Sequence, residues 1–291
     1  MTAAMYTARR MMKTLVISKN VGGQVILAYD IKNYPGIEFI RGVDLINKMN
    51  QQVKDSGVDI IIDEVKKVSK NHDGNFLVET GKNSYSAKTI IITMGLEPKQ
   101  LHLSREDELT GLGISYCANC DGPLFKGKNV AVVGGGNAAL DATELMSKIA
   151  AKVYLIYRKP QLKAFESLIL SVKNKNNVEI ILSSEICEIA GNLKLEKLKI
   201  INNISKNLRE LEVDGLFVEI GHKPKTTAVI DLVRTDSLGQ VIVDLSGKTS
   251  CDGVFAAGDV TPIEFKQIVI GCGQGAVAAL SAYKYLQLKT S

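Results

Sequence analysis

The sequence has little of what small disulfide-linked or metal-bound proteins depend on: no tryptophan, five cysteines and three histidines in 291 residues. Five scattered cysteines are too few for a disulfide framework in a chain of this length. No apolar run reaches the roughly 18 residues that span a membrane. Lysine and arginine give a net charge of +5 but form no run typical of a nucleic-acid-binding arm. We therefore expect a cytoplasmic protein that binds neither membrane nor nucleic acid.

Acidic residues are also missing from the start of the chain, where the first one is Asp30. An acid-free segment such as "MTAAMYTARRMMK" (Met1–Lys13) has the composition of a transit peptide. It also has the pattern of a helix from the body of a domain. We favour the helix, because of a resemblance described below.

The order of the expected elements indicates an α/β fold. The length suits two domains better than one. Apolar periodicity predicts helices over 42–56 and 273–286. Short strands are expected at 13–19, 57–63, 76–80, 84–95, 239–244 and 253–260. Alternation of strands and helices predicts parallel sheets with helices on both faces.

A glycine turn stands at the centre of a strand-turn-helix-strand segment that begins at Asn129. Gly134, Gly136 and Ala139 fit the pattern G-x-G-x-x-G/A. Glycine lets the backbone turn tightly and approach a pyrophosphate, whose charge then lies at the helix N-terminus. The segment therefore predicts a dinucleotide site, and the alternative is a plain structural turn.

Cations follow the second strand of this segment, where an NAD site usually has an acidic residue. Arg158, Lys159 and Lys163 would suit the 2′-phosphate of NADP. We therefore expect NADPH to be preferred over NADH, and the alternative is a solvated basic turn.

Two of the cysteines, Cys117 and Cys120, form a C-x-x-C that Asp121 follows directly. Such a pair can close a small disulfide ring or supply half of a zinc site. Zinc is disfavoured because there is no second C-x-x-C and the histidines are far apart in sequence; an inert reduced pair is a further alternative. The redox interpretation is favoured, since a carboxylate beside the thiols can move the proton that reduction requires. A nicotinamide does not usually reduce a protein disulfide directly, so a flavin site is expected as well.

Over nearly its whole length the chain resembles the low-molecular-weight thioredoxin reductase family of flavoproteins. The resemblance rests on motifs whose order and spacing are specific together: "GGQ" (22–24), "NYPG" (33–36), "TMG" (93–95), "YCANCDG" (116–122), "VVGGGNAALDA" (132–142), "YRKPQLKA" (157–164), "GLFVEIGHKP" (215–224) and "GVFAAGDV" (253–260).

The resemblance implies roles for the matching positions. Cys120 would lie against the flavin, Cys117 would attack the disulfide of the partner protein, and Asp121 would be the acid/base. FAD would be held by residues of the first and last motifs: Gly23, Gln24, Asn33, Gly95, Gly258, Asp259 and Gln267. NADPH would be held by the glycine turn and the basic segment: Gly134, Gly136, Asn137, Ala139, Arg158, Lys159 and Lys163. At positions 159 and 163 this sequence has lysines where the family has arginines. The positive charge is kept, but a lysine cannot form the two parallel hydrogen bonds that an arginine makes to a phosphate.

The resemblance also implies a layout of two Rossmann-like, three-layer nucleotide-binding domains. Residues 1–99 and 225–291 would form the FAD domain, with an NADPH domain of residues 100–224 inserted in it. Hinges would lie near Lys99 and 221–225, and the protein would be a homodimer. Family members begin with a strand and a glycine turn before the first helix. We therefore expect residues 1–13 to belong to that helix, with the first strand and its turn missing from this sequence.

Three functions remain open at this stage. The leading one is transfer of electrons from NADPH through FAD and the Cys117–Cys120 pair to thioredoxin or a thioredoxin-like protein. The second is the reductase component of an alkyl hydroperoxide reductase system. The third is an NADP-binding remnant that binds flavin poorly, which the missing first strand would favour.

Overall fold

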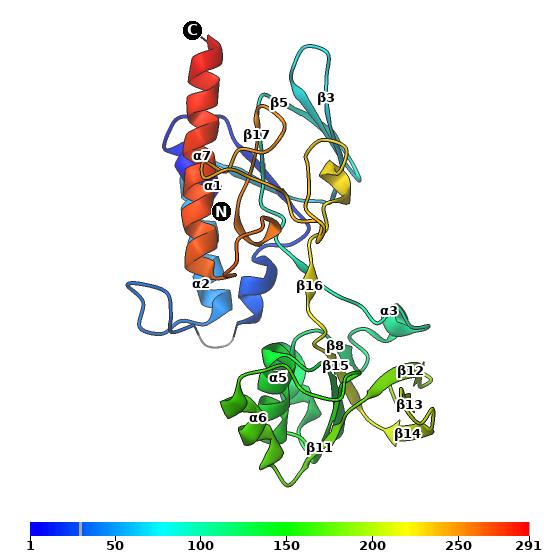
Figure 1. The fold of residues 1–291 in the computed structure, drawn as a ribbon. Helices are drawn as coiled ribbons and strands as arrows, with labels where there is room; N and C mark the ends of the chain where they lie inside the picture. Colours follow the sequence, from blue (N-terminus) through cyan, green and yellow to red (C-terminus); the bar gives the residue numbers. More distant parts are fainter. Residues whose placement is uncertain (29–30, 291) are drawn as a thin grey trace. The chain divides into compact units, whose positions relative to one another are not determined.

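A computed structural model describes residues 1–28 and 31–290. It divides into two compact units (Figure 1). Unit 1 comprises residues 1–97 and 223–291, and unit 2 comprises residues 98–222. The chain passes between them at β7 (Glu97–Pro98) and β16 (His222–Lys223), and these two short strands pair with each other.

Unit 2 is built on a five-stranded parallel sheet. Its order is β11 (Val178–Ile181), β10 (Lys152–Ile156), β9 (Asn129–Val133), β15 (Gly215–Val218) and β8 (Ile114–Ser115). The central strands β9 and β15 are almost entirely buried. Near-continuous apolar strands of this kind are typical of a parallel sheet covered on both faces.

Side chains of the central strands alternate between two cores, as the period of a strand requires. Val130, Val132 and Phe217 pack with the helices α5 (Asn137–Ser147) and α6 (Glu166–Lys173). The neighbouring positions Ala131, Val133, Leu216 and Val218 face the opposite way, into a second core. The result is a three-layer unit.

The second core is closed by a sheet rather than by helices. It is the antiparallel sheet of β12 (Ser184–Ala190), β13 (Lys197–Asn202) and β14 (Leu208–Glu212). In Figure 1 it lies on the side of the parallel sheet opposite α5 and α6. The expectation of helices on both faces is therefore wrong for this unit. The reason is that Ile186, Leu198 and Ile200 alternate with exposed or half-buried polar positions, so each strand buries one face only.

Unit 1 contains two separate parallel pairs of strands and one antiparallel sheet. The pairs are β1 (Leu15–Ser18) with β2 (Asp59–Ile62) and β6 (Ile90–Ile92) with β17 (Val254–Ala256). The antiparallel sheet consists of β3 (Val65–Lys70), β4 (Phe76–Thr80) and β5 (Ser84–Ala87). The short 3-10 turns are η1 (Gly23–Leu27), η3 (Thr227–Val229) and η4 (Gly258–Val260).

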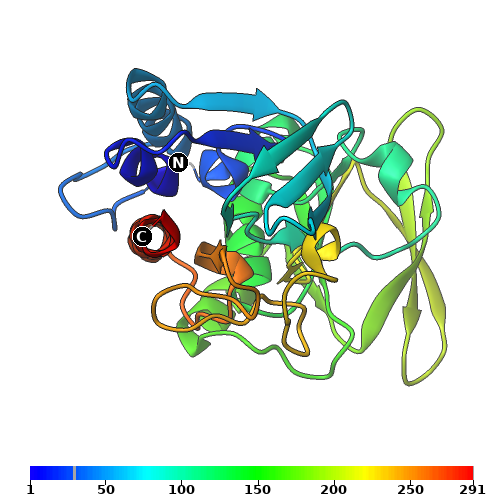
Figure 2. The same ribbon diagram turned by 90° about the horizontal axis from the view of Figure 1, so that it is seen from above.

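Among the described residues of unit 1, three α-helices accompany these strands: α1 (Thr2–Ala8), α2 (Gly42–Asp55) and α7 (Ile268–Thr290). Both ribbon views place α1 beside α7, which Figure 2 shows end-on. Gly275 of α7 lies at this contact, where a Cβ would be 3.4 Å from the backbone nitrogen of Ala3, at van der Waals distance. The helix expected at the start of the chain is therefore present. No helix among the described residues is long and apolar enough to cross a membrane.

The strand expected over 239–244 is wrong. Only an isolated bridge between Thr235 and Val241 forms there. The carboxylate of Asp236 accepts the N–H groups of Leu238 and Gln240, both at 2.9 Å. Asp side chains that bind nearby backbone groups stabilise turns at the expense of sheet ladders, so the apolar alternation of this segment does not produce a strand.

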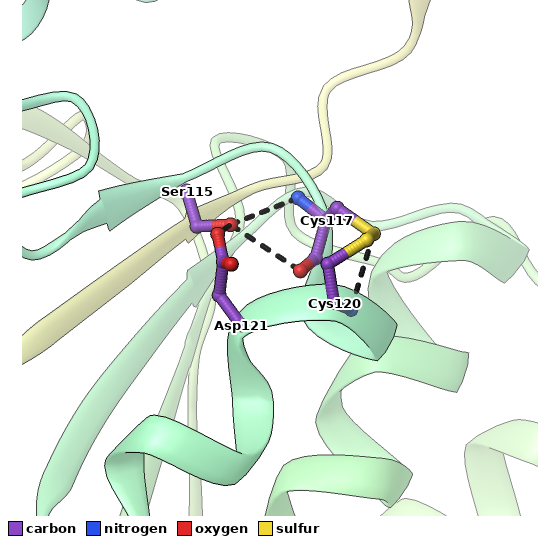
Figure 3. The surroundings of a disulfide bond; sticks show 4 residues. All are labelled: Ser115, Cys117, Cys120 and Asp121. Atoms are coloured by element: carbon purple, nitrogen blue, oxygen red, sulfur yellow. Dashed lines mark hydrogen bonds between the residues drawn. A yellow bond between two sulfur atoms is a disulfide. The ribbon is translucent and has the colours of Figure 1, made fainter. Parts of the chain in front are cut away.

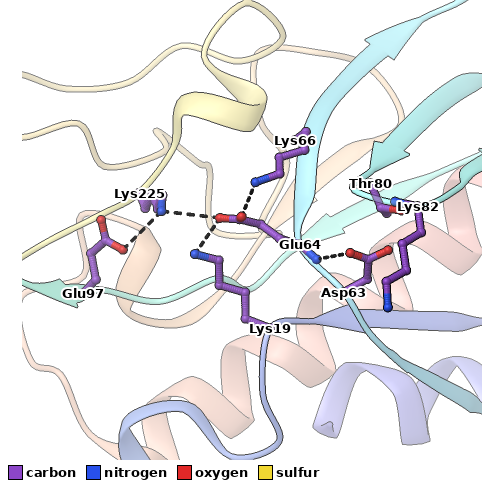
Figure 4. A network of polar contacts seen from close by, with 8 residues as sticks. All are labelled: Lys19, Asp63, Glu64, Lys66, Thr80, Lys82, Glu97 and Lys225. Atoms are coloured by element: carbon purple, nitrogen blue, oxygen red, sulfur yellow. Dashed lines mark hydrogen bonds and ion pairs between the residues drawn. The ribbon is translucent and has the colours of Figure 1, made fainter. Parts of the chain in front are cut away.

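Glu64, between β2 and β3, is the centre of an ion-pair network in unit 1 (Figure 4). Its carboxylate lies 2.5 Å from the ammonium of Lys19 and 3.4 Å from that of Lys225, and it also pairs with Lys66. Lys225, which follows β16, contacts Glu97 at 3.8 Å as well. Hydrogen bonds from Lys19 and Lys66 lower the pKa of Glu64 from 4.5 to about 2.

This network predicts an acid-sensitive contribution to the stability of unit 1. The pKa of Glu64 is depressed in the folded chain, so its contribution is present above about pH 4.5 and is lost as the pH falls toward 2. We expect the midpoint of urea unfolding to fall less between pH 4.5 and pH 2 in the Glu64→Gln variant than in the unsubstituted protein. Glu264→Gln, at an exposed position, is the control, and the same acid dependence in all three proteins would contradict the prediction.

Candidate functional site

The Cys117–Cys120 pair is a disulfide in the turn that follows β8 in unit 2. The Cα atoms are 5.4 Å apart. Cys117 caps the short helix α4 (Ala118–Asp121), and its sulfur accepts the backbone N–H of Cys120 at 3.2 Å. Cys120 is exposed, whereas Cys117 is half-buried. The geometry therefore leaves the disulfide accessible at the surface of unit 2.

Asp121 is held in place by Ser115, a residue that the sequence analysis missed (Figure 3). The Ser115 hydroxyl donates to the Asp121 carboxylate at 2.6 Å and accepts the N–H of Cys117 at 3.0 Å. Ser115 is buried, with 5% of its surface exposed. One hydroxyl thus links the acidic side chain to the backbone of the redox pair. Its position just before "YC" was the only sequence signal for it.

A second carboxyl group, that of Glu219, follows the strand next to β8 in the sheet and was not predicted. It follows β15 directly, and its backbone N–H donates to Val133 at 2.9 Å. Burial, with a smaller contribution from the nearby charge of Asp141, raises the pKa of Glu219 to about 7, and the backbone N–H of Ala118, the residue after Cys117, opposes this rise. The signal for Glu219 was a single acidic residue at the end of a buried apolar strand.

The glycine turn after β9 has the close backbone contacts that glycine permits. A Cβ on Gly134, whose φ is 147°, would lie 2.2 Å from the backbone oxygen of Glu219. A Cβ on Gly135 would overlap the ring of Tyr157. Gly136 is the N-cap residue of α5, and no side chain caps the helix there. The N–H groups of the first turn of α5 are therefore open to an anionic ligand, while Ala139 is buried behind them.

The basic segment after β10 is tied to the glycine turn. The backbone N–H of Lys163 donates to Gly135 at 2.7 Å, and the N–H of Phe165 donates to the Asn137 side chain at 2.8 Å. Arg158, Lys159 and Lys163 are exposed. None of the ion pairs found among the described residues occupies any of the three. The structure thus brings the predicted dinucleotide residues together around one turn.

In unit 1, hydrogen bonds join predicted flavin residues that are far apart in sequence. The Asn33 amide donates to Gln267 at 3.0 Å, and the Gln24 amide donates to the backbone of Leu96, next to Gly95, at 2.7 Å. Gly23, Gln24, Asn33 and Gln267 are all exposed. These contacts arrange polar side chains at the surface of unit 1.

The Gly258–Asp259 turn follows β17 in unit 1. Gly258 has a φ of 78°, a backbone conformation that favours glycine. Its N–H donates to the Gln274 side chain at 2.8 Å. The ammonium of Lys266 donates to the backbone of Asp259 at 3.2 Å, and burial lowers the pKa of that lysine. The turn is thus rigidly tied to the start of α7.

The remaining cysteines do not extend the redox site. Cys187 is exposed on β12, and Cys251 and Cys272 are partly buried in unit 1. Among the residues that the structure describes, no group of three or more His, Cys, Asp or Glu side chains could hold a metal ion.

Comparisons with known proteins match nearly the whole chain. The model of the pyridine nucleotide-disulphide oxidoreductase family matches residues 1–275. A thioredoxin reductase of Listeria monocytogenes is 36% identical, over 99% of this chain and 90% of the relative. A component of the alkyl hydroperoxide reductase of Escherichia coli is 35% identical, over 98% of this chain and 56% of the relative. The crystal structure of Lactococcus lactis thioredoxin reductase superposes with a TM-score of 0.86 at 34% identity, covering 99% of this chain and 95% of that one.

The Ser115 contacts predict a local loss of stability in Ser115→Ala. The variant loses the bond to Asp121 and leaves the N–H of Cys117 without its acceptor, which costs about 1–3 kcal/mol. We expect amide hydrogen exchange at Cys117 and in the segment 115–121 to become faster. Ser147→Ala, whose hydroxyl bonds only the backbone of its own helix α5, is the control, and unchanged exchange at Cys117 would refute the assignment.

Proposed function

We propose that this chain, which belongs to the pyridine nucleotide-disulphide oxidoreductase family, is an FAD-dependent thioredoxin-disulfide reductase that takes its electrons from NADPH. The observation that carries the proposal is the accessible Cys117–Cys120 disulfide with its fixed Asp121 carboxylate. It lies at the same edge of the sheet as the glycine turn, since both follow the carboxyl ends of parallel strands. Ligand sites of open α/β sheets occur at this edge.

The proposed reaction needs two electrons and a proton at the sulfurs. When bound, FAD supplies electrons drawn from NADPH. Reduction breaks the bond between Cys117 and Cys120 and, with one proton, gives a thiol and a thiolate. We assign to Asp121 the task of holding and returning that proton, because Ser115 fixes its carboxylate beside the pair. We assign to Cys117 the attack on the partner disulfide and to Cys120 the position against the flavin, as the resemblance implies.

Unit 1 fits FAD as its ligand. Its exposed amide side chains, Gln24, Asn33 and Gln267, are already joined to one another or to nearby backbone by hydrogen bonds. The Gly258–Asp259 turn, which α7 holds, would place a carboxylate against a polyhydroxy chain. We assign residues 1–99 and 225–291 to FAD on these grounds.

Unit 2 fits NADPH. The uncapped N-terminus of α5 behind the glycine turn suits a pyrophosphate. The exposed cations at Arg158, Lys159 and Lys163 suit an additional phosphate. We assign residues 100–224 to NADPH on these grounds.

The partner that we propose is thioredoxin or a thioredoxin-like protein, and we expect a homodimer in the cytoplasm, without membrane attachment. The similarity to the alkyl hydroperoxide reductase component, at 35% identity, favours a second candidate. In that case the dithiol would reduce the disulfide of a peroxide-reducing system. Parallel assays with oxidised thioredoxin and with a peroxide-reducing protein would separate the two.

The visible absorption spectrum of the purified 291-residue chain tests the function directly. We expect about one FAD per chain, bleached by NADPH, and NADPH-dependent reduction of oxidised thioredoxin. Cys120→Ser should keep the flavin and lose the disulfide reductase activity, because no intramolecular disulfide can form. Full activity in Cys120→Ser would refute the mechanism. A colourless chain would favour the NADP-binding remnant.

The basic segment predicts the choice of nicotinamide. Arg158→Ala should raise the KM for NADPH by roughly tenfold and leave that for NADH unchanged, because one charge-assisted phosphate contact is lost. Lys173→Ala, at the exposed end of α6, is the matched control. Equal turnover of the unsubstituted enzyme with NADH would contradict the assignment of NADPH.

A further inference from the structure

Glu106 is a buried acid to which the proposed reaction gives no role. It begins α3 (Glu106–Leu109), and 2% of its surface is exposed. One carboxylate oxygen accepts the N–H of Leu101 and the hydroxyl of Tyr116, each at 2.8 Å, and the other accepts the N–H of Leu103 at 3.3 Å. Buried carboxyl groups persist where donors of this kind satisfy their oxygens.

The three donors come from two different segments of unit 2. Two of them belong to residues 98–105, here called the entry segment because the chain enters unit 2 there. The third, Tyr116, directly precedes Cys117. All three residues pack against the core that the antiparallel sheet closes. The Glu106 carboxylate therefore joins the entry segment to the redox pair.

The entry segment has a backbone conformation that needs support from its surroundings. His102 and Arg105 have φ of 59° and 69°, in the left-handed region that residues with a side chain seldom adopt. Such conformations persist where the surroundings fix them. Here the Glu106 carboxylate accepts two N–H groups of the segment, and the Arg105 guanidinium donates to the backbone of Asn192 at 3.2 Å. Loss of the carboxylate bonds would therefore loosen the entry segment.

Cys117 is restrained by the residues before it. Tyr116 is held through its hydroxyl, which donates to Glu106, and burial, with a smaller contribution from that bond, raises the pKa of Tyr116 to about 12. The hydroxyl therefore stays a donor at neutral pH. The N–H of Cys117 itself donates to Ser115 at 3.0 Å. The bond between Tyr116 and Glu106 is thus one of two restraints on the backbone of the redox pair.

We propose that Glu106 is a positioning residue that couples the entry segment to the Cys117–Cys120 pair through Tyr116. The proposal rests on the redox role assigned above to this pair. With Tyr116 held by the carboxylate, Cys117 stays close to Cys120 after reduction, which favours closure of the disulfide. With Tyr116 released, the reduced pair samples more conformations and closure becomes less favourable. Because coupling is reciprocal, reduction of the pair also weakens the hold of the carboxylate on the entry segment.

The first measurement is the ratio of reduced to oxidised pair in the full-length protein. Samples are equilibrated at neutral pH with fixed ratios of reduced and oxidised dithiothreitol, trapped with a maleimide and analysed by mass. Closure forms the bond between Cys117 and Cys120, and the two electrons and two protons of the thiols pass to oxidised dithiothreitol, which becomes its dithiol. Tyr116→Phe should raise the ratio roughly threefold, as expected for the loss of one hydrogen bond. Tyr154→Phe, on β10 in the same core, is the matched control and should leave the ratio unchanged.

The second measurement is amide hydrogen exchange at Leu101 and Leu103, whose N–H groups the carboxylate accepts. In the unsubstituted protein, reduction of the pair should speed exchange at both amides roughly threefold, by the reciprocity of the coupling. In Tyr116→Phe the two amides should exchange at the same rate in both redox states. A bond that serves the fold alone would lower the thermal stability of Tyr116→Phe and leave the ratio and the redox dependence unchanged.

Glu106→Gln is the second variant, because its amide nitrogen cannot accept a hydrogen bond. It should shift the ratio in the same direction as Tyr116→Phe. An unchanged ratio in Tyr116→Phe would overturn the proposal. So would exchange at Leu101 and Leu103 that is independent of the redox state in the unsubstituted protein, a result that needs no variant to fold. A pair that no dithiothreitol ratio reduces in the unsubstituted protein would instead contradict the proposed function.

Discussion

The shared direction of five strands is the constraint on which unit 2 depends. Because β8, β9 and β15 are parallel neighbours in one sheet, the segments that follow them emerge at a single edge. The redox disulfide follows β8, the glycine turn follows β9 and Glu219 follows β15. An antiparallel sheet would have sent one of the three to the opposite edge. The position of the site therefore follows from the parallel direction of the strands. The segments after the strands supply the reactive side chains.

Local hydrogen bonds then fix what the sheet brings together. Ser115, two residues before Cys117, is hydrogen-bonded to the carboxylate of Asp121, and a second carboxyl group, that of Glu219, follows the neighbouring strand. Asp121 comes from the redox segment itself, whereas Glu219 comes from a strand far along the chain. The two groups sit in different surroundings, and such differences are how proteins separate the tasks of neighbouring acids.

Much of the fold could be predicted from local sequence patterns. Most of the features that could not be predicted depend on contacts between residues far apart in sequence. The helices over 42–56 and at the C-terminus, the strand-turn-helix at Asn129 and the C-x-x-C were readable because each depends on neighbours in sequence. The antiparallel cover of unit 2 was missed, because Ile186 and Leu198 show their face only once β12 pairs with β13. The strand expected at 239–244 was wrong, because the carboxylate of Asp236 takes the N–H groups of its own turn. The place of Glu219 beside the redox segment was not predicted, since it depends on strands that are far apart in sequence, and its one signal was an acidic residue at the end of a buried apolar strand. The cofactor roles assigned to Gln24, Asn33 and Asp259 stay predictions.

The pairing of β7 with β16 has a consequence for biosynthesis. Because β6 belongs to the first part of unit 1 and its neighbour β17 to the last, the ribosome must deliver all of unit 2 before β6 can be paired. The apolar residues Ile90–Ile92 are therefore without their parallel neighbour for that whole interval. Unit 2 is continuous in sequence and has cores of its own, so it can form first and hold the two halves of unit 1 close through the adjacent strands β7 and β16. A folded unit 2 would thus keep β6 close to the C-terminal segment, so that β17 can pair with β6 sooner.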